Sequence, residues 1–151
     1  MSDYYFLHEI GVTYGADTSR RYRIARSRPG TGVGLFTQVP IASHEFVIEY
    51  MGQRILTLEA DRLKTRYLFE IDETWTIDGS SRSNIARYIN HACDPNCRAD
   101  IVGSRIMFFA KHDITTGEEL TVDYGNEYFE EFIRPIGCKC GKCSLALMVN
   151  C

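Results

Sequence analysis

Short strand-like stretches separated by turn residues run along most of this chain, and they limit its fold more than any other feature. Such stretches occur at 23–26, 35–36, 46–50, 67–71, 75–77, 106–110 and 120–122. Helical patterns are few: Thr57 is expected to cap a short helix that extends to Lys64, and Ser83 to cap one turn at 84–88. Doubly wound folds need long helices between strands, so we predict a mainly β fold instead.

The length of 151 residues suits one domain of ordinary size. A hydrophobic content of 44% and a charged content of 25% are typical of globular proteins. No stretch approaches the ~20 apolar residues that cross a bilayer, and the N-terminus has no signal-peptide pattern. We therefore expect an intracellular protein of the cytoplasm or nucleus that does not bind membranes. The net charge of −3 gives no basic footprint for direct nucleic-acid binding.

Three of the six cysteines, Cys138, Cys140 and Cys143, lie within six residues near the C-terminus. In a reducing compartment, such spacing indicates metal binding more often than disulfides, although free thiols are the alternative. A structural zinc site has four ligands in a tetrahedron, so one more ligand must come from elsewhere. The candidates for it are Cys93, Cys97, Cys151 and the histidines.

Glycine occupies three of the five positions from Gly30 to Gly34. The run lacks the third glycine of a G-x-G-x-x-G loop, the lysine of a phosphate-binding loop and a following helix, so a dinucleotide site is not expected. Two interpretations remain open. The run is either a plain β-turn or a loop whose bare backbone approaches a small ligand.

The run from Arg87 to Cys97 is too polar for an ordinary core strand and too rich in specialised groups for an ordinary loop. Asn90, His91 and Cys93 place an amide, an imidazole and a thiol within four positions. Each group alone has a structural explanation, as does Tyr124 at the end of a predicted strand, since buried aromatic residues are common in cores. Packing alone does not explain their density.

Taken together and in this order, these segments resemble the SET domain family of protein lysine methyltransferases. The resemblance extends from about Arg23 to Cys143 and is carried by Gly32-Val33-Gly34, Glu49-Tyr50-Met51-Gly52, Tyr67-Leu68-Phe69, the run from Arg87 to Cys97, Gly117-Glu118-Glu119-Leu120, Asp123-Tyr124-Gly125 and the terminal cysteines. It implies a flank at 1–22, a SET domain at 23–126 and a post-SET-like zinc-binding tail at 127–151. The family fold has several small β-sheets, few short helices and a C-terminal pseudoknot that brings Asn90-His91 beside Asp123-Tyr124.

The resemblance also implies a function. The chain is expected to be a protein-lysine N-methyltransferase that moves a methyl group from S-adenosylmethionine to a lysine side chain of a protein, with basic substrates such as histones as candidates. One alternative is a catalytically silent SET-like module that contains zinc and only binds partners. The other is a plain zinc-binding interaction domain, which leaves the glycine loop and Asn90-His91 unexplained.

Residue roles follow from matching positions in the family motifs. The residues expected to bind the cofactor are Gly32, Val33, Gly34, Tyr67, Arg87, Asn90, His91 and Tyr124. Tyr124 is the main catalytic candidate, and Tyr50 and Tyr67 are expected to line the lysine channel. Cys93 is expected to be the fourth zinc ligand, beside Cys138, Cys140 and Cys143.

The sequence departs from the family pattern in two places. The tail spacing is C-x-C-x₂-C, whereas C-x-C-x₄-C is usual in the family. Val122 stands two residues before Tyr124, where many members have phenylalanine or tyrosine, and the smaller side chain predicts room for higher methylation states. Glu130 and Glu131, just beyond, are expected to favour a basic peptide.

Overall fold

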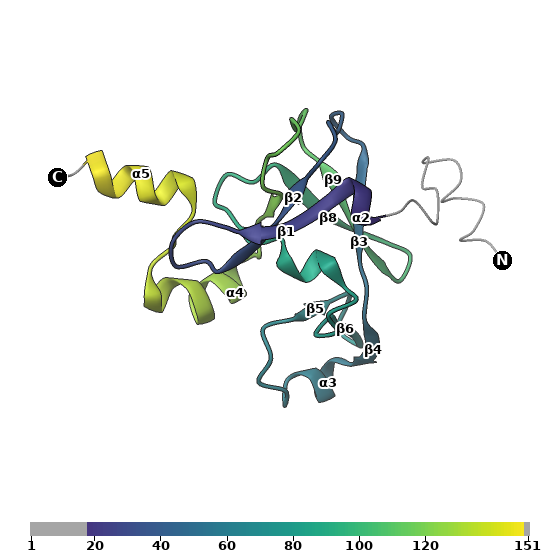
Figure 1. Cartoon of the computed structure of the whole chain (residues 1–151). Coiled ribbons are helices and arrows are strands. Elements are labelled where there is room, and N and C mark those ends of the chain that lie inside the picture. The colour runs from purple at the N-terminus through teal and green to yellow at the C-terminus, as the bar shows by residue number, and fades with distance from the viewer. Residues whose placement is uncertain (1–17, 150–151) are drawn as a thin grey trace.

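The computed structural model describes residues 18–149, and within them the strands form four small sheets of two or three strands each (Figure 1). The strands are β1 (Tyr22–Arg26), β2 (Val33–Thr37), β3 (Phe46–Tyr50), β4 (Gln53–Leu56), β5 (Leu68–Glu70), β6 (Trp75–Asp78), β7 (Asn90–His91), β8 (Cys97–Val102), β9 (Arg105–Ala110) and β10 (Thr121–Val122). The prediction of a mainly β fold with several small sheets is confirmed.

Helical segments are short. They are α2 (Thr18–Arg21), α3 (Thr57–Ala60), η1 (Ile85–Tyr88), α4 (Asn126–Tyr128), η2 (Phe129–Ile133), η3 (Arg134–Ile136) and α5 (Gly141–Val149). In Figure 1, α5 lies at one side of the molecule, away from α3 and the β4–β6–β5 sheet. Among the residues that the structure describes, no helix is long and apolar enough to cross a membrane.

The sheet β3-β9-β8 contributes much of the core. Its middle strand β9 buries both faces, with Ile106 and Phe108 on one face and Met107 on the other. The β1–β2 hairpin is connected to this sheet by the hydroxyl of Tyr22, which donates to the Val47 carbonyl at 2.6 Å. Burial raises the pKa of Tyr22 to about 12, so the phenol remains a donor.

The smallest sheet is the one that positions the candidate site. β7 and β10 pair in parallel, with Thr121 opposite Asn90 and Val122 opposite His91. The buried Asn96 extends this pairing, since its Nδ2 donates to the Glu119 carbonyl at 2.8 Å and its Oδ1 accepts from the Thr121 amide at 2.9 Å. Two segments thirty residues apart in sequence are thereby held side by side, as the family resemblance predicted.

The predicted helix from Thr57 to Lys64 is wrong in its length and in its cap. The helix α3 ends at Ala60, and the position before it is Leu56. The hydroxyl of Thr57 donates to the Asp72 carbonyl at 3.2 Å and lies 3.0 Å from the Thr76 hydroxyl, so tertiary partners occupy it.

The predicted cap at Ser83 is also wrong. The turn begins at Ile85, and Asn84 precedes it without a side-chain capping bond. Asn84 is buried and instead donates to the Gly79 carbonyl at 3.1 Å while accepting from the Met51 amide at 3.2 Å. The Ser83 hydroxyl pairs with that of Ser81. These long-range bonds were not visible in the local pattern.

Candidate functional site

The amide of Asn90 lies at the meeting point of three segments. Its Nδ2 donates to the Val33 carbonyl at 3.0 Å and to Glu119 Oε1 at 2.7 Å. The Ser27 hydroxyl contacts the same carboxylate, at 2.6 Å from Oε1 and 2.8 Å from Oε2. The end of β1, the start of β2 and the segment before β10 therefore converge on the side chain of one β7 residue.

The glycine run owes its composition to two separate constraints. Gly30 and Gly32 have positive φ angles of 88° and 79°, which only glycine adopts easily. Gly34 lies in β2, but a Cβ there would overlap the Glu119 carboxylate and lie 3.2 Å from Asn90 Nδ2. The turn interpretation fits Gly30 and Gly32, while Gly34 is closely approached by the Glu119 and Asn90 side chains. Approach of this loop to a small ligand stays a prediction.

Tyr124 follows β10 and is held at three points. Its hydroxyl donates to the Ile89 carbonyl at 2.6 Å, its amide donates to His91 Nδ1 at 3.2 Å, and its ring meets the edge of Tyr128 at a centroid distance of 4.7 Å. Burial raises the pKa of Tyr124, and the nearby phenols of Tyr128, Tyr50 and Tyr67 raise it further. The Tyr124 phenol therefore stays neutral and fixed in direction.

His91 connects Tyr124 to the cysteine-rich region. Its side chain is largely buried, with Nδ1 3.7 Å from the Asp123 carboxylate and Nε2 3.5 Å from Cys93 Sγ. Burial lowers the pKa of His91, while Asp123 acts in the opposite direction. Because Nδ1 accepts from the Tyr124 amide, the neutral ring carries its proton on Nε2, directed at the Cys93 sulfur.

Tyr50 is a core residue as well as a neighbour of the site. It is 8% exposed, and its ring contacts Phe69 and Phe108 at centroid distances of 5.6 and 6.3 Å. Its hydroxyl donates to the Tyr67 carbonyl at 2.8 Å. Burial raises the pKa of Tyr50, so this phenol is also neutral. The three predicted tyrosines thus gather in one region.

Arg87 stands behind this aromatic group. Its guanidinium carbon lies 3.8 Å from the centroid of the Tyr67 ring, and its Nη1 donates to the Ser80 carbonyl. Arg87 was expected to bind the cofactor, and that role stays a prediction. Its guanidinium also lies 5.4 Å from the centroid of the Tyr88 ring.

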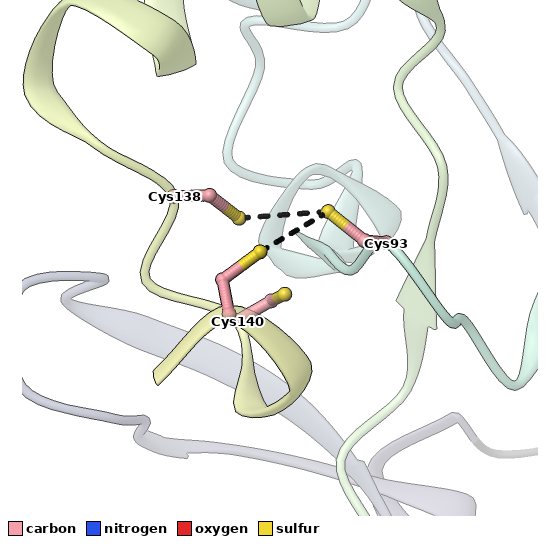
Figure 2. Close-up of side chains that lie close together, drawn as sticks. Cys93, Cys138 and Cys140 are labelled. Atoms are coloured by element: carbon pink, nitrogen blue, oxygen red, sulfur yellow. Dashed lines mark hydrogen bonds between the residues drawn. The ribbon is translucent and has the colours of Figure 1, made fainter. Parts of the chain in front are cut away.

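The thiols of four cysteines, one from the segment after β7 and three from the tail, gather in one cluster (Figure 2). The Sγ atoms of Cys93, Cys138, Cys140 and Cys143 all lie within 4.8 Å of one another. Cys93 Sγ is 3.8 Å from Cys138 Sγ and 3.7 Å from Cys143 Sγ. Sulfurs bound at about 2.3 Å to a tetrahedral zinc ion lie about 3.8 Å apart, so this donor set fits zinc.

Of the other candidate ligands in the described part of the chain, Cys97 is not in this group of thiols, whereas His91 lies beside it, with Nε2 3.5 Å from Cys93 Sγ. Cys97 is fully buried, its thiol contacts Asn96 Oδ1 at 3.5 Å, and burial raises its pKa to about 12. Cys151 lies outside the described residues. In the cluster, burial would raise the pKa of Cys140, but hydrogen bonds outweigh it and lower the pKa to about 6. A thiolate, the form that binds metal, is thus favoured at one position.

The cysteine-bearing tail also contacts the glycine loop. A Cβ on Gly30 would lie 3.4 Å from Cγ of Lys139, and a Cβ on Gly141 would lie 2.8 Å from a guanidinium nitrogen of Arg28. Residues 139–141 therefore pack against the β1–β2 turn, which explains why α5 lies beside this hairpin in Figure 1.

Sequence reasoning missed two groups of this site. Glu119 was noted only as part of a motif, although its carboxylate contacts Asn90 and Ser27. The segment 127–132 was interpreted through its acidic residues, yet Tyr128 packs on Tyr124, and Phe129 packs on His91 at 5.5 Å. The aromatic residues between the acids were the available signal.

A model of the SET domain family matches residues 32–125, a range that contains the glycine loop, the Asn90-His91 pair and Tyr124. The chain belongs to the SET domain family. The family resemblance inferred from the sequence motifs is confirmed.

Several histone-lysine methyltransferases are similar to this SET domain chain. One from Emericella nidulans, named as specific for lysine 4 of histone H3, is 38% identical over 130 residues, covering 78% of this chain and 11% of that protein. The Dictyostelium discoideum histone-lysine N-methyltransferase set1 is 38% identical over 150 residues, which cover 90% of this chain and 10% of that protein. A Saccharomyces cerevisiae enzyme named as specific for lysine 4 of histone H3 is 40% identical over 121 residues, which cover 72% of this chain and 11% of that protein. The chain spans about a tenth of the length of these curated relatives.

Proposed function

We propose that this SET domain chain is a protein-lysine N-methyltransferase that uses S-adenosylmethionine as methyl donor. The observation that carries the proposal is the position of Tyr124. Its neutral phenol is anchored to the Ile89 carbonyl and lies beside β7, whose Asn90 reaches the glycine loop. A cofactor-contacting loop and an oriented aromatic hydroxyl therefore meet at one small parallel sheet.

The proposed donor site fits the residues present. Gly32 has open space where a Cβ would stand, and Gly34 allows the β2 backbone to approach Asn90 closely. Backbone groups of residues 32–34 and the amide of Asn90 would hold the methionine part of the donor, which supplies an electrophilic methyl group on a sulfonium. His91 and Arg87 would support the donor site from behind through Tyr124 and Tyr67.

The acceptor lysine must be neutral to attack, although its ordinary pKa is about 10.4. An aromatic surrounding disfavours the ammonium form by desolvation, and the phenols of Tyr50, Tyr67 and Tyr124 supply such a surrounding. Because burial keeps Tyr50 and Tyr124 protonated, neither phenol acts as a base at neutral pH, and the lysine proton leaves to solvent. The phenols orient the amine, and orientation provides much of the rate.

We also propose that residues 127–151 form a post-SET-like tail, after a SET domain at 23–126, and that Zn²⁺ held by Cys93, Cys138, Cys140 and Cys143 fastens this tail. The fit of the four sulfurs to a tetrahedron supports this assignment. The shortened C-x₂-C spacing does not prevent Cys140 and Cys143 from joining the cluster.

The proposed substrate is a basic protein segment, with histone H3 near lysine 4 as the first candidate because similar enzymes carry that specificity in their names. Val122, which is 4% exposed in the core, leaves the position two residues before Tyr124 without a bulky ring, which supports higher methylation states. Glu130 forms an exposed ion pair with Arg134 at 2.8 Å, so of the two tail acids Glu131 is the better candidate for contacting a basic peptide.

The proposal is tested by incubating the protein with radiolabelled methyl donor and peptides of the histone H3 N-terminus, followed by mass spectrometry. Transfer is expected to the peptide with lysine at position 4, and a peptide with alanine there is the matched control. A protein that binds the donor calorimetrically but transfers no methyl to histones or to lysate proteins would be a silent binding module.

A further inference from the structure

Glu119 occupies the centre of the proposed donor site but has no role in the chemistry described above. Its side chain is half-buried behind β2 and accepts hydrogen bonds from Ser27 and Asn90. Its backbone is fixed as well, by a bridge to Phe36 and by the bond from Asn96 Nδ2 to its carbonyl. The carboxylate is therefore held rigidly against the amide of Asn90.

The bonding partners of Asn90 decide which way its amide faces. An ionised carboxylate only accepts hydrogen bonds, and so does a backbone carbonyl. The Glu119 carboxylate and the Val33 carbonyl thus both require the NH₂ group of Asn90 on their side. The remaining group, the Asn90 Oδ1, is free to accept a bond from a ligand.

We propose that Glu119 is a positioning residue of the donor site, which fixes the Asn90 amide so that Oδ1 faces the ammonium group of the methionine part. This inference rests on the proposed use of S-adenosylmethionine. Without a carboxylate at position 119, only the Val33 carbonyl still holds the Asn90 NH₂, and the amide rotates more readily to direct its NH₂ toward the ammonium, where two donors would oppose each other. Gly34 is the condition for this arrangement, because a side chain there would displace the carboxylate.

Ser27 completes the arrangement. Its hydroxyl donates to both carboxylate oxygens, and its backbone amide donates to the Gly32 carbonyl at 2.9 Å across the glycine turn. The carboxylate that orients Asn90 is therefore also bonded to the turn that approaches the donor. Glu119 therefore sets both the direction of the Asn90 amide and the distance of that amide from the glycine turn.

The test compares two probes by calorimetry on the zinc-loaded protein. S-adenosylhomocysteine carries the amino-acid part, whereas 5′-methylthioadenosine lacks it but shares the nucleoside. Glu119→Gln is expected to weaken S-adenosylhomocysteine binding by about three- to tenfold, since one oriented hydrogen bond is lost, and to leave 5′-methylthioadenosine binding unchanged. The melting temperature of each variant reports on the fold.

Two further variants separate positioning from simple structural support. Glu118→Gln removes the adjacent charge, which contacts only Thr115 among the described bonds, and is expected to change neither affinity. In an Asn90→Ala background, Glu119→Gln should have no additional effect on S-adenosylhomocysteine, because the amide that it positions is gone.

Three outcomes would overturn the inference: equal S-adenosylhomocysteine affinity for Glu119→Gln and wild type, equal losses for both probes, or an undiminished effect in the Asn90→Ala background. Failure of the proposed function gives a different result, because the wild-type protein would then bind neither probe.

Discussion

Asn90 and His91 are neighbours on one short strand, yet the two regions that they face are held together in different ways. Asn90 faces a hydrogen-bonded region in which Glu119, Ser27 and Val33 come from strands or their ends. His91 faces the tail, where its ring meets Phe129 and its Nε2 lies near Cys93. The first region is held by hydrogen bonds between chain segments, whereas the second contains the four-thiol cluster proposed to bind zinc.

This difference predicts which of the two regions should be disturbed by loss of metal. Sheet pairing holds the glycine loop and Asn90 together, so this half should survive loss of metal. Among the tail residues whose burial the structure describes, Cys140 alone is buried. We therefore expect the position of the tail to depend on the thiol cluster and on the contact of Lys139 with Gly30. Because that contact reaches the donor loop, the tail region should still affect the affinity of the other half.

The largest effect is expected from metal removal. Structural zinc contributes on the order of 10 kcal/mol to the fold of a small metal-bound segment, so the tail should lose its order entirely when a chelator is added. Protease cleavage between 134 and 149 should then become rapid, while the strands persist by circular dichroism, and S-adenosylhomocysteine affinity should fall more than tenfold. Cys138→Ser, which removes one proposed zinc ligand, should have the same effects as the chelator. Cys97→Ala is the control and should keep one zinc per chain. Donor affinity that is unchanged by chelation would mean that the two regions are independent.

The next largest effect is expected for Tyr124→Phe, which removes the oriented phenol where the two regions meet. By analogy with the loss of one preorganised donor, kcat should fall about 10²-fold or more, while donor affinity changes little. Tyr22→Phe is the matched control, because it removes a phenol-to-carbonyl bond of the same length from the core. Methyl-transfer assays measure the turnover of both variants. Near-wild-type turnover of Tyr124→Phe would remove Tyr124 from its proposed role.

A smaller effect is expected for His91→Ala, which tests the connection to the cluster itself. The Nε2 proton directed at Cys93 is a contact of the kind that orients metal ligands, and losing such contacts lowers metal affinity about 10- to 100-fold. Competition with a zinc-binding dye measures this loss. His112→Ala, at an exposed site, is the control. Equal zinc affinity for both variants would show that His91 serves the Tyr124 side alone.

The sequence predicted the parts of this molecule that local patterns encode. Most of the strands were available from apolar stretches, and the family and the position of Asn90-His91 beside Asp123-Tyr124 from motif order and the family resemblance. Strands β4, β7 and β8 were not predicted. The predicted helix caps failed because the Thr57 hydroxyl bonds to the distant Asp72 carbonyl, and the Ser83 hydroxyl bonds to its near neighbour Ser81. The role of Glu119 could not be read either, since its contact with Asn90 joins residues 29 positions apart.

The smallest effect is expected where α2 meets the segment before β3, because Arg21 and the Ala42 amide both bond to the Glu45 carboxylate there. Burial acts to raise the pKa of Glu45, but these two bonds outweigh it and hold the pKa below its ordinary value. A carboxyl whose pKa is lower in the folded state stabilises the fold above its unfolded pKa, near 4.3, and this stabilisation is lost as the pH falls through the folded value. Because the pair is partly exposed and screened, Glu45→Gln should cost less than about 1 kcal/mol at pH 7.

That cost should shrink as the pH falls below about 4.3 and through the lower folded pKa of Glu45, and it should vanish once this carboxyl is protonated in the folded state as well. Urea unfolding at several pH values measures it, with and without chelator. The difference in unfolding free energy between wild type and Glu45→Gln should be the same with and without chelator. The Arg21–Glu45 pair joins α2 to the segment before β3, and this part of the fold is not expected to depend on metal. If this free-energy difference disappears with chelator, this part of the fold also needs the thiol cluster. The contrast between the two sides of β7 would then be wrong.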